Sequence, residues 1–125
     1  MRSLNKVALM GYLATDPELK STTGGKNVAT FKIATNRDWK SADGDKHEST
    51  DFHKIVTWRG LADAVAKHLT KGAGVYLEGR LSNHQYKDKE GHDRMVTEIV
   101  ADTINFLNFK KTKDSEEVNL VEVPS

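Results

Sequence analysis

The segment 50–82, TDFHKIVTWRGLADAVAKHLTKGAGVYLEGRLS, decides the fold because its pattern of apolar residues changes twice. Residues 50–58 are rich in aromatic and β-branched side chains, which predicts a strand. Helical spacing follows in an apolar stripe formed by Leu61, Ala62, Val65, Ala66 and Leu69. Lys71 and Gly72 then supply a cationic last turn and a stop. Residues 74–82 predict another strand, so one helix of about three turns separates two strands.

Two further strands and one polar segment precede this stretch. Residues 5–13 form an apolar run that ends at a turn. Residues 28–36 alternate with period two and are the clearest strand in the chain. Residues 37–50 are polar apart from Trp39 and Ala42, which predicts a long loop or a mobile hairpin.

The fifth strand follows a projecting hairpin. The strand at 74–82 continues as an extended arm to a tip at 89–92, and residues 94–108 return. Three strands, one helix and two strands is the element order of an OB-fold barrel. We therefore predict an all-β protein with one helix: a five-stranded OB-fold Greek-key barrel, its helix between strands three and four, with an extended β-hairpin arm.

One domain is expected from a length of 125 residues. We assign residues 1–109 to the barrel and 110–125 to a short acidic tail that we predict to be disordered. All 19 Lys and Arg and 14 of the 18 Asp and Glu lie at or before Lys113, so that part carries +5 and the remainder −4. A basic body with an acidic tail is typical of nucleic-acid binders, although a solvated surface with a frayed end would show the same charges.

Composition excludes several chemistries. The chain has no cysteine, which excludes disulfides, thiolate zinc sites and cysteine nucleophiles. No run approaches the ~20 apolar residues of a membrane helix, and no apolar signal core precedes the first strand, so we expect a cytoplasmic protein without a membrane partner. No Walker loop, dinucleotide glycine pattern or Ser-His-Asp arrangement occurs, so we expect no enzyme activity and no cofactor.

Aromatic residues next to cations recur four times. The groups are Trp39 with Arg37 and Lys40, Phe52 with Lys54, Trp58 with Arg59, and Tyr86 with Lys87. Binding of single-stranded nucleic acid needs this combination, because bases stack on aromatic rings while cations follow the phosphates. Trp39 and Tyr86 lie in polar segments and are predicted to be exposed. Phe52 and Trp58 share one strand face, which is either the binding face or the barrel interior.

An ordered set of motifs resembles the bacterial and mitochondrial single-stranded DNA-binding proteins. The motifs are Leu4-Asn5-Lys6-Val7, Gly11, Asp16-Pro17, the segment 31–39, Phe52-His53-Lys54-Ile55-Val56, Lys71-Gly72, Val75-Tyr76-Leu77-Glu78-Gly79 and Val100-Ala101-Asp102. Together they cover about residues 3–108. The resemblance implies a homotetramer, a dimer of dimers of OB folds, around which single-stranded DNA wraps in replication, recombination and repair without strong sequence preference.

The resemblance also implies roles for individual residues. It makes Trp39, Phe52, Trp58 and Tyr86 the base-stacking residues. It makes Lys6, Lys54 and Lys71 phosphate contacts, to which we add the cations beside the aromatics, Arg37, Lys40, Arg59 and Lys87. It places His53 and Tyr76 at a subunit interface, and it implies no metal.

Two departures from the family pattern affect these expectations. Ser82, His84 and Gln85 stand where many relatives carry basic residues, which predicts a shallower salt dependence of binding. The tail lacks a long linker and a terminal aromatic, so recruitment of replication or repair proteins through it is left open. A phage-encoded or divergent bacterial protein fits this tail, which favours the bacterial nucleoid or a phage-infected cell over the mitochondrial matrix.

Two rival functions are considered. One is an OB-fold protein for RNA or an oligomeric primosome component, which competition between matched DNA and RNA strands distinguishes. The other is a metal-dependent hydrolase using His47, Glu48, Asp51 and His53. The second is disfavoured because His53 and Asp51 share a strand face while His47 lies in the polar segment.

Overall fold

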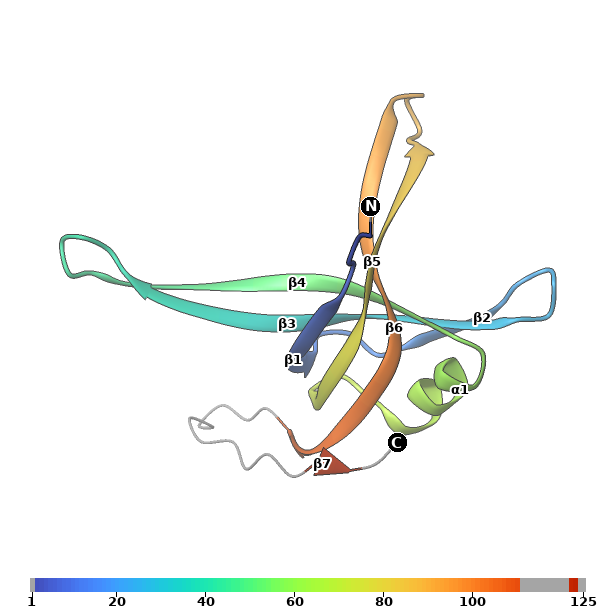
Figure 1. Ribbon diagram of the computed structural model, residues 1–125, viewed down its shortest axis with the longest axis horizontal. Helices are drawn as coiled ribbons and strands as arrows, with labels where there is room; N and C mark the ends of the chain where they lie inside the picture. The colour runs from blue at the N-terminus through green and yellow to red at the C-terminus, as the bar shows by residue number, and fades with distance from the viewer. Residues whose placement is uncertain (1, 111–121, 124–125) are drawn as a thin grey trace.

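The computed structural model describes residues 2–110 and 122–123 and is built from strands with one helix (Figure 1). The elements are β1 (Val7–Leu13), β2 (Glu18–Ser21), β3 (Asn27–Lys40), β4 (Lys46–Trp58), α1 (Arg59–His68), β5 (Ala73–Lys87), β6 (Asp93–Lys110) and β7 (Glu122–Val123). In the part of the chain described, no helix is long and apolar enough to cross a membrane.

Five of these strands close into a barrel. β1 pairs antiparallel with β5 along its length and with β3 at Tyr12 and Leu13. β3 pairs with β4, and β5 pairs with β6. The ring is closed by a parallel contact between β4 and β6, where Ile55 lies opposite Ile99. The predicted OB-fold barrel is therefore confirmed, with α1 between its third and fourth strands.

Alternation along the strands fills the barrel. Its largest fully buried side chains include Leu13, Ile33, Ile55, Leu77 and Ile104. Since successive residues of a strand point to opposite faces, this buried set leaves the intervening side chains on the outside of the barrel.

The helix contributes apolar residues to the same core. Ala62 and Val65 of α1 are fully buried and pack with the barrel residues. The helix ends one residue earlier than predicted, at His68, with Leu69 as its buried C-cap. Lys71 therefore lies in the turn that follows rather than in a last helical turn. The amide of Gly72, at φ 93°, donates to the Leu13 carbonyl at 2.8 Å and ties this turn to β1.

Gly79 lets β5 and β6 approach each other where the barrel becomes an arm. The register between the two strands shifts between Glu78 and Gly79, which marks a β-bulge. A Cβ atom on Gly79 would lie 2.1 Å from the carbonyl oxygen of Val100 and 2.8 Å from the Cα of Ala101. Only glycine fits this position without moving backbone.

Three hairpins leave the barrel in different directions (Figure 1). The polar segment 37–50, predicted as a long loop or a mobile hairpin, is a hairpin whose strands pair as far as Lys40 and Lys46. We call its outer part, residues 36–50, the long hairpin, and we call residues 83–97 of the β5–β6 hairpin the arm. The third hairpin is made by β3 with β2, which was not predicted because all four of its residues are exposed.

Most of the predicted disordered tail, residues 110–125, lies outside the described residues. Its described parts are Lys110, the last residue of β6, which pairs with Ala73, and β7, which pairs antiparallel with Phe106 and Leu107 of β6.

Candidate nucleic-acid interface

The outer face of β4 carries Phe52, Lys54, Val56 and Trp58. Phe52 is 63% exposed and Trp58 is 41% exposed, whereas Ile55, on the opposite face of the strand, is fully buried. The two aromatics therefore lie on the outside of the barrel, and the alternative that they fill its interior is excluded. They are available to a ligand, as base stacking requires.

Beside Trp58 the outer face is hollowed into an open groove of about 320 Å³. Its lining residues come from four adjacent strands: Val28 and Thr30 of β3, Val56 and Trp58 of β4, Arg80, Ser82 and His84 of β5, and Glu98 and Val100 of β6. We call this surface, together with Phe52, Lys54 and Tyr86, the groove face. It combines an aromatic wall, apolar floor residues and cations, which is what a nucleotide strand requires.

A buried carboxylate lies on the groove face. Glu98 is only 8% exposed, and its Oε2 lies 2.9 Å from Nζ of Lys54. Its Oε1 lies 2.7 Å from Nε2 of His84. The charge of Lys54, predicted to contact phosphate, is thus paired with an acid of the protein. Glu98 was not predicted as a site residue, because on β6 it occupies an ordinary outward position and its partners come from β4 and β5.

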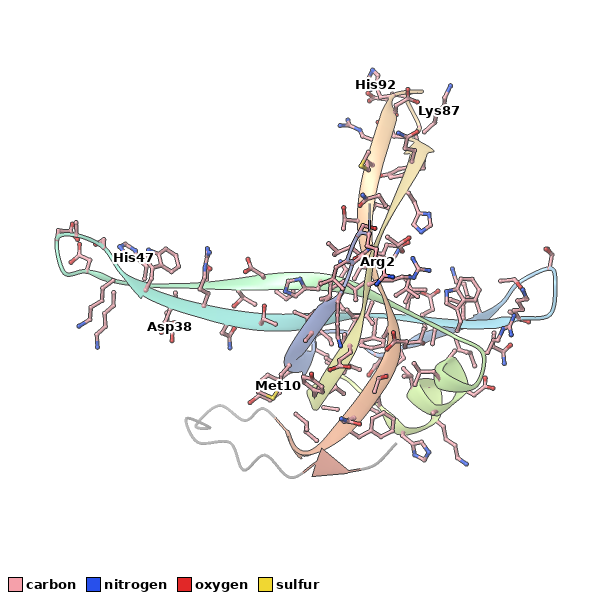
Figure 2. All side chains as sticks on the ribbon, viewed as in Figure 1. Arg2, Met10, Asp38, His47, Lys87 and His92 are labelled. Atoms are coloured by element: carbon pink, nitrogen blue, oxygen red, sulfur yellow. The ribbon has the colours of Figure 1, made fainter. Side chains whose placement is uncertain are left out.

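The long hairpin carries Trp39 in an aromatic cluster. The ring of Trp39, which is 43% exposed, stacks on His47 with centroids 5.3 Å apart, and the Arg37 guanidinium lies 5.0 Å from the Trp39 centroid. A surface hollow of about 360 Å³ is lined by Trp39 and His47 together with Asp38, Lys40, Lys46 and Glu48. Figure 2 shows Asp38 and His47 on this hairpin, away from the barrel. The sequence predicted Trp39 and Arg37 as DNA contacts and offered His47 only as a metal ligand of the rival hydrolase; its place opposite Trp39 follows from the β3–β4 register.

Trp39 and Phe52 project from opposite faces of the β3–β4 ribbon. The register pairs Trp39 with His47 and Ala34 with Phe52, without an irregularity between them. Phe52 and His47 are separated by an odd number of positions along β4, so their side chains lie on opposite faces of the strand. Trp39, which is paired with His47, therefore lies on the face opposite Phe52. The structure therefore brings Phe52 and Trp58 together on the groove face, but it does not bring Trp39 to that face.

Tyr86 continues the groove face along the arm. It is 53% exposed and lies two residues beyond His84 on β5, hence on the same face. Lys87 follows it, and Figure 2 shows Lys87 and His92 near the end of the arm.

Asp88 closes the tip of the arm. Its Oδ1 accepts the backbone amides of Glu90 and His92 at 2.9 Å each, and the Nε of Arg94 donates to its Oδ2 at 3.0 Å. The hydrogen bond from the His92 amide, followed by that from Arg94, lowers the pKa of Asp88 below its ordinary value. The ionised carboxylate thus holds the tip together and keeps the arm a regular hairpin next to Tyr86.

The remaining predicted phosphate contacts are scattered. Nζ of Lys6 lies 3.8 Å from Oε1 of Glu78, outside the groove. Arg59 is exposed at the start of α1, with φ 57°, directly after Trp58. Lys71 is exposed in the turn after α1, where its backbone amide donates to Asp16 at 2.8 Å. Of these three, Arg59 alone adjoins a groove residue in the chain.

The predicted interface residues have partners within the chain. His53 is half-buried, and a hydrogen bond of 2.9 Å joins its Nε2 to the hydroxyl of Thr35. The hydroxyl of Tyr76 donates to Oε2 of Glu78 at 2.7 Å. Their place at a subunit interface stays a prediction. Among the described residues, no three His, Asp or Glu side chains are grouped so as to hold a metal ion, so the rival metal-dependent hydrolase gains no support.

A closed barrel with this strand order and this helix defines the class: the chain is an OB-fold protein, and its groove face has the aromatics and cations typical of nucleic-acid-binding members. The model of the single-strand binding protein family matches residues 4–107, and the chain belongs to that family. The resemblance noted in the sequence is thereby confirmed.

Individual relatives agree with this assignment. Single-stranded DNA-binding protein 1 of Staphylococcus aureus strain MSSA476 is 42% identical over 114 residues, which cover 91% of this chain and 72% of the relative. Single-stranded DNA-binding protein 1 of Chlorobaculum tepidum is 42% identical over 110 residues, 87% of this chain and 68% of that protein. The solved complex of Plasmodium falciparum SSB with ssDNA superposes with a TM-score of 0.79 at 33% identity and covers 86% of this chain and 98% of the other.

Proposed function

We propose that this protein binds and protects single-stranded DNA without strong sequence preference during replication, recombination and repair. The observation that carries the proposal is the groove face, where Phe52, Trp58 and Tyr86 are all exposed beside cations. The relatives named as single-stranded DNA-binding proteins and the Plasmodium complex with ssDNA support the same ligand.

Stacking explains how such a face binds without reading sequence. Every base has a π-face, so a base gains about 1–3 kcal/mol on an aromatic ring whatever its identity. Arg80 lines the groove and Arg59 follows Trp58 in the chain, so both are candidates for phosphate contact, while Lys54 already has Glu98 as a partner. We infer that stacking on Trp58, Phe52 and Tyr86 contributes more of the affinity than ion pairing does.

We propose that the working form is a homotetramer, a dimer of dimers. β1 pairs with β3 only at Tyr12 and Leu13, so among the described residues the other edge of its first half has no strand beside it. An uncovered edge is a place for a second chain to pair. Met10, which is 49% exposed beside Tyr76, lies on this part of the molecule. By strand alternation Trp39 lies on the other face of the β3–β4 ribbon from Phe52, so we infer that a strand contacting both passes around the long hairpin or on to a neighbouring protomer.

The test is a titration with poly(dT) followed by tryptophan fluorescence, with solution mass measured with and without DNA. The chain has two tryptophans, so Trp39→Phe and Trp58→Phe each leave a single reporter. We expect quenching of both reporters, saturation at low salt, and the mass of a tetramer. Absence of binding at low salt together with unquenched tryptophans would refute the proposal, and a monomer mass would refute the tetramer.

Preference for DNA over RNA is proposed from the family alone, and a competition between dT and rU oligonucleotides of equal length tests it. The cytoplasmic location stays a prediction, and recruitment of other proteins by the tail stays an open question.

A further inference from the structure

His84 lies on the groove face with one ring nitrogen against a buried carboxylate. Nε2 is 2.7 Å from Oε1 of Glu98, and the other oxygen of Glu98 is 2.9 Å from Nζ of Lys54. An ionised carboxylate only accepts hydrogen bonds, so Nε2 must carry a hydrogen to bond with it. A proton gained by the ring therefore goes to Nδ1.

Nδ1 is the nitrogen that remains for a ligand. The His84 side chain is 57% exposed, and within residues 2–110 the structure gives its Nδ1 no hydrogen-bond partner. The hydroxyl of Ser82 approaches Nε2, at 3.4 Å, rather than Nδ1. In the neutral ring Nδ1 is an acceptor, as a phosphate oxygen is, so the two cannot bond. In the protonated ring Nδ1 donates, and the contact is assisted by charge.

Protonation of His84 changes the net charge of the cluster that it forms with Glu98 and Lys54. The charged and titratable groups that share the face come from five strands: Glu18 and Lys20 of β2, Lys32 of β3, Lys54 of β4, Arg80 and Tyr86 of β5, and Arg94 and Glu98 of β6. Glu18 and Lys20 pair with each other at 3.3 Å. Glu98 cancels the charge of Lys54, and Asp88 pairs with Arg94. With the ring neutral, the Glu98–Lys54–His84 cluster has no net charge, and with the ring protonated it carries one positive charge.

We propose that His84 binds a DNA phosphate in its protonated form only, with Glu98 as the residue that positions its ring, so that DNA binding takes up a proton at this site. The inference rests on the proposed function. The groove face then has a cation at this position only when the ring is protonated, and the buried Glu98 orients that ring.

Binding should then strengthen as the pH falls. Histidine is the side chain whose charge ordinarily changes between about pH 5 and 8. A charge-assisted contact in a partly exposed site changes affinity by about two- to tenfold. The chain has four other histidines, His47, His53, His68 and His92, so the pH dependence must be assigned by substitution.

The experiment measures binding of fluorescein-labelled oligo(dT) by anisotropy at fixed sodium concentration, between about pH 8 and about pH 6. For the unaltered protein we expect affinity to rise about two- to tenfold over this range. His84→Gln should lose most of the change in affinity between the two pH values. His84→Arg should bind tightly at both, with a steeper dependence on salt. Titration calorimetry in buffers of different ionisation enthalpy should show proton uptake that His84→Gln lacks.

Two further variants separate positioning from folding. His68→Gln, in the last turn of α1 against Phe106, is the matched control and should keep the full pH dependence. Glu98→Gln should bind DNA but with a reduced pH dependence, because the charge that attracts the imidazolium is gone. If His84→Gln retains the pH dependence of the unaltered protein, the inference is wrong. If the unaltered protein binds no oligo(dT) at either pH, the proposed function itself fails.

Discussion

Replacing Gly79 by alanine should destabilise the barrel where β5 becomes the arm. The added Cβ would lie 2.1 Å from the Val100 carbonyl oxygen and 2.8 Å from the Ala101 Cα. Both atoms belong to backbone, so relief requires β5 and β6 to separate. Overpacking costs about 1–3 kcal/mol, and two ladder hydrogen bonds weakened by about 0.5–1.5 kcal/mol each add to it. We expect Gly79→Ala to lower the free energy of unfolding by about 2–6 kcal/mol, out of roughly 5–15 kcal/mol for a typical domain.

Urea unfolding followed by tryptophan fluorescence measures this loss, at one fixed protein concentration because oligomerisation contributes to stability. Gly60→Ala is the matched control. Gly60 lies in α1, and a Cβ there meets no atom within 4 Å. Alanine should therefore stabilise the protein by about 0.5–1 kcal/mol. A loss below about 1 kcal/mol for Gly79→Ala, or equal effects of the two substitutions, would contradict the assignment of Gly79 to a close backbone approach.

Other substitutions test the site and the core. Trp58→Ala should weaken oligo(dT) binding by about 5- to 150-fold, the loss of one stacked base, with folding checked by circular dichroism; Trp39→Ala should leave the quenching of Trp58 by short oligonucleotides intact. Because the pKa of Asp88 is lowered, its bonds persist above about pH 4 and are lost as the pH falls further, so the protection of the arm-tip amides against hydrogen exchange, relative to unprotected amides at the same pH, should fall there; Asp88→Asn should show reduced protection already at neutral pH. Thr57→Val leaves the fully buried Ala29 carbonyl without the hydroxyl donor at 2.9 Å and should cost about 1–3 kcal/mol in urea unfolding.

The barrel could be predicted because each of its strands has an apolar face. The apolar positions in the alternation over residues 28–36 and in the helical spacing over 61–69 correspond to residues that are buried or half-buried in the structure. β2 could not be predicted, since all four of its residues are exposed and its only reason to be extended is pairing with β3. The long hairpin is extended for the same reason, as it pairs out to Lys40 and Lys46 without any apolar pattern.

The site was predicted in its residue types but not in its arrangement. The spacing of Phe52 and Trp58 gave a shared face, and burial of Ile55 between them decided which face it was. Glu98 and His84 could not be recognised, because their contact with each other and with Lys54 depends on β6 lying between β5 and β4. That strand order results from closure of the barrel, so it cannot be predicted from the sequence pattern of any single strand.

The parallel contact between β4 and β6 also fixes when the barrel can form during translation. Ile55 and Ile99 are 44 residues apart in the chain, and α1 and all of β5 must be synthesised between them. At about 5–20 residues per second the ribosome needs about 2–9 s for this interval. During this interval, the apolar side chains of Phe31, Ile33 and Ile55 are not yet covered by the core residues of β5 and β6. The nascent protein thus passes through an incomplete sheet with exposed apolar side chains, and the elongation rate sets the lifetime of this state. Slow codons between residues 59 and 99 would lengthen its exposure to chaperones and to neighbouring nascent chains.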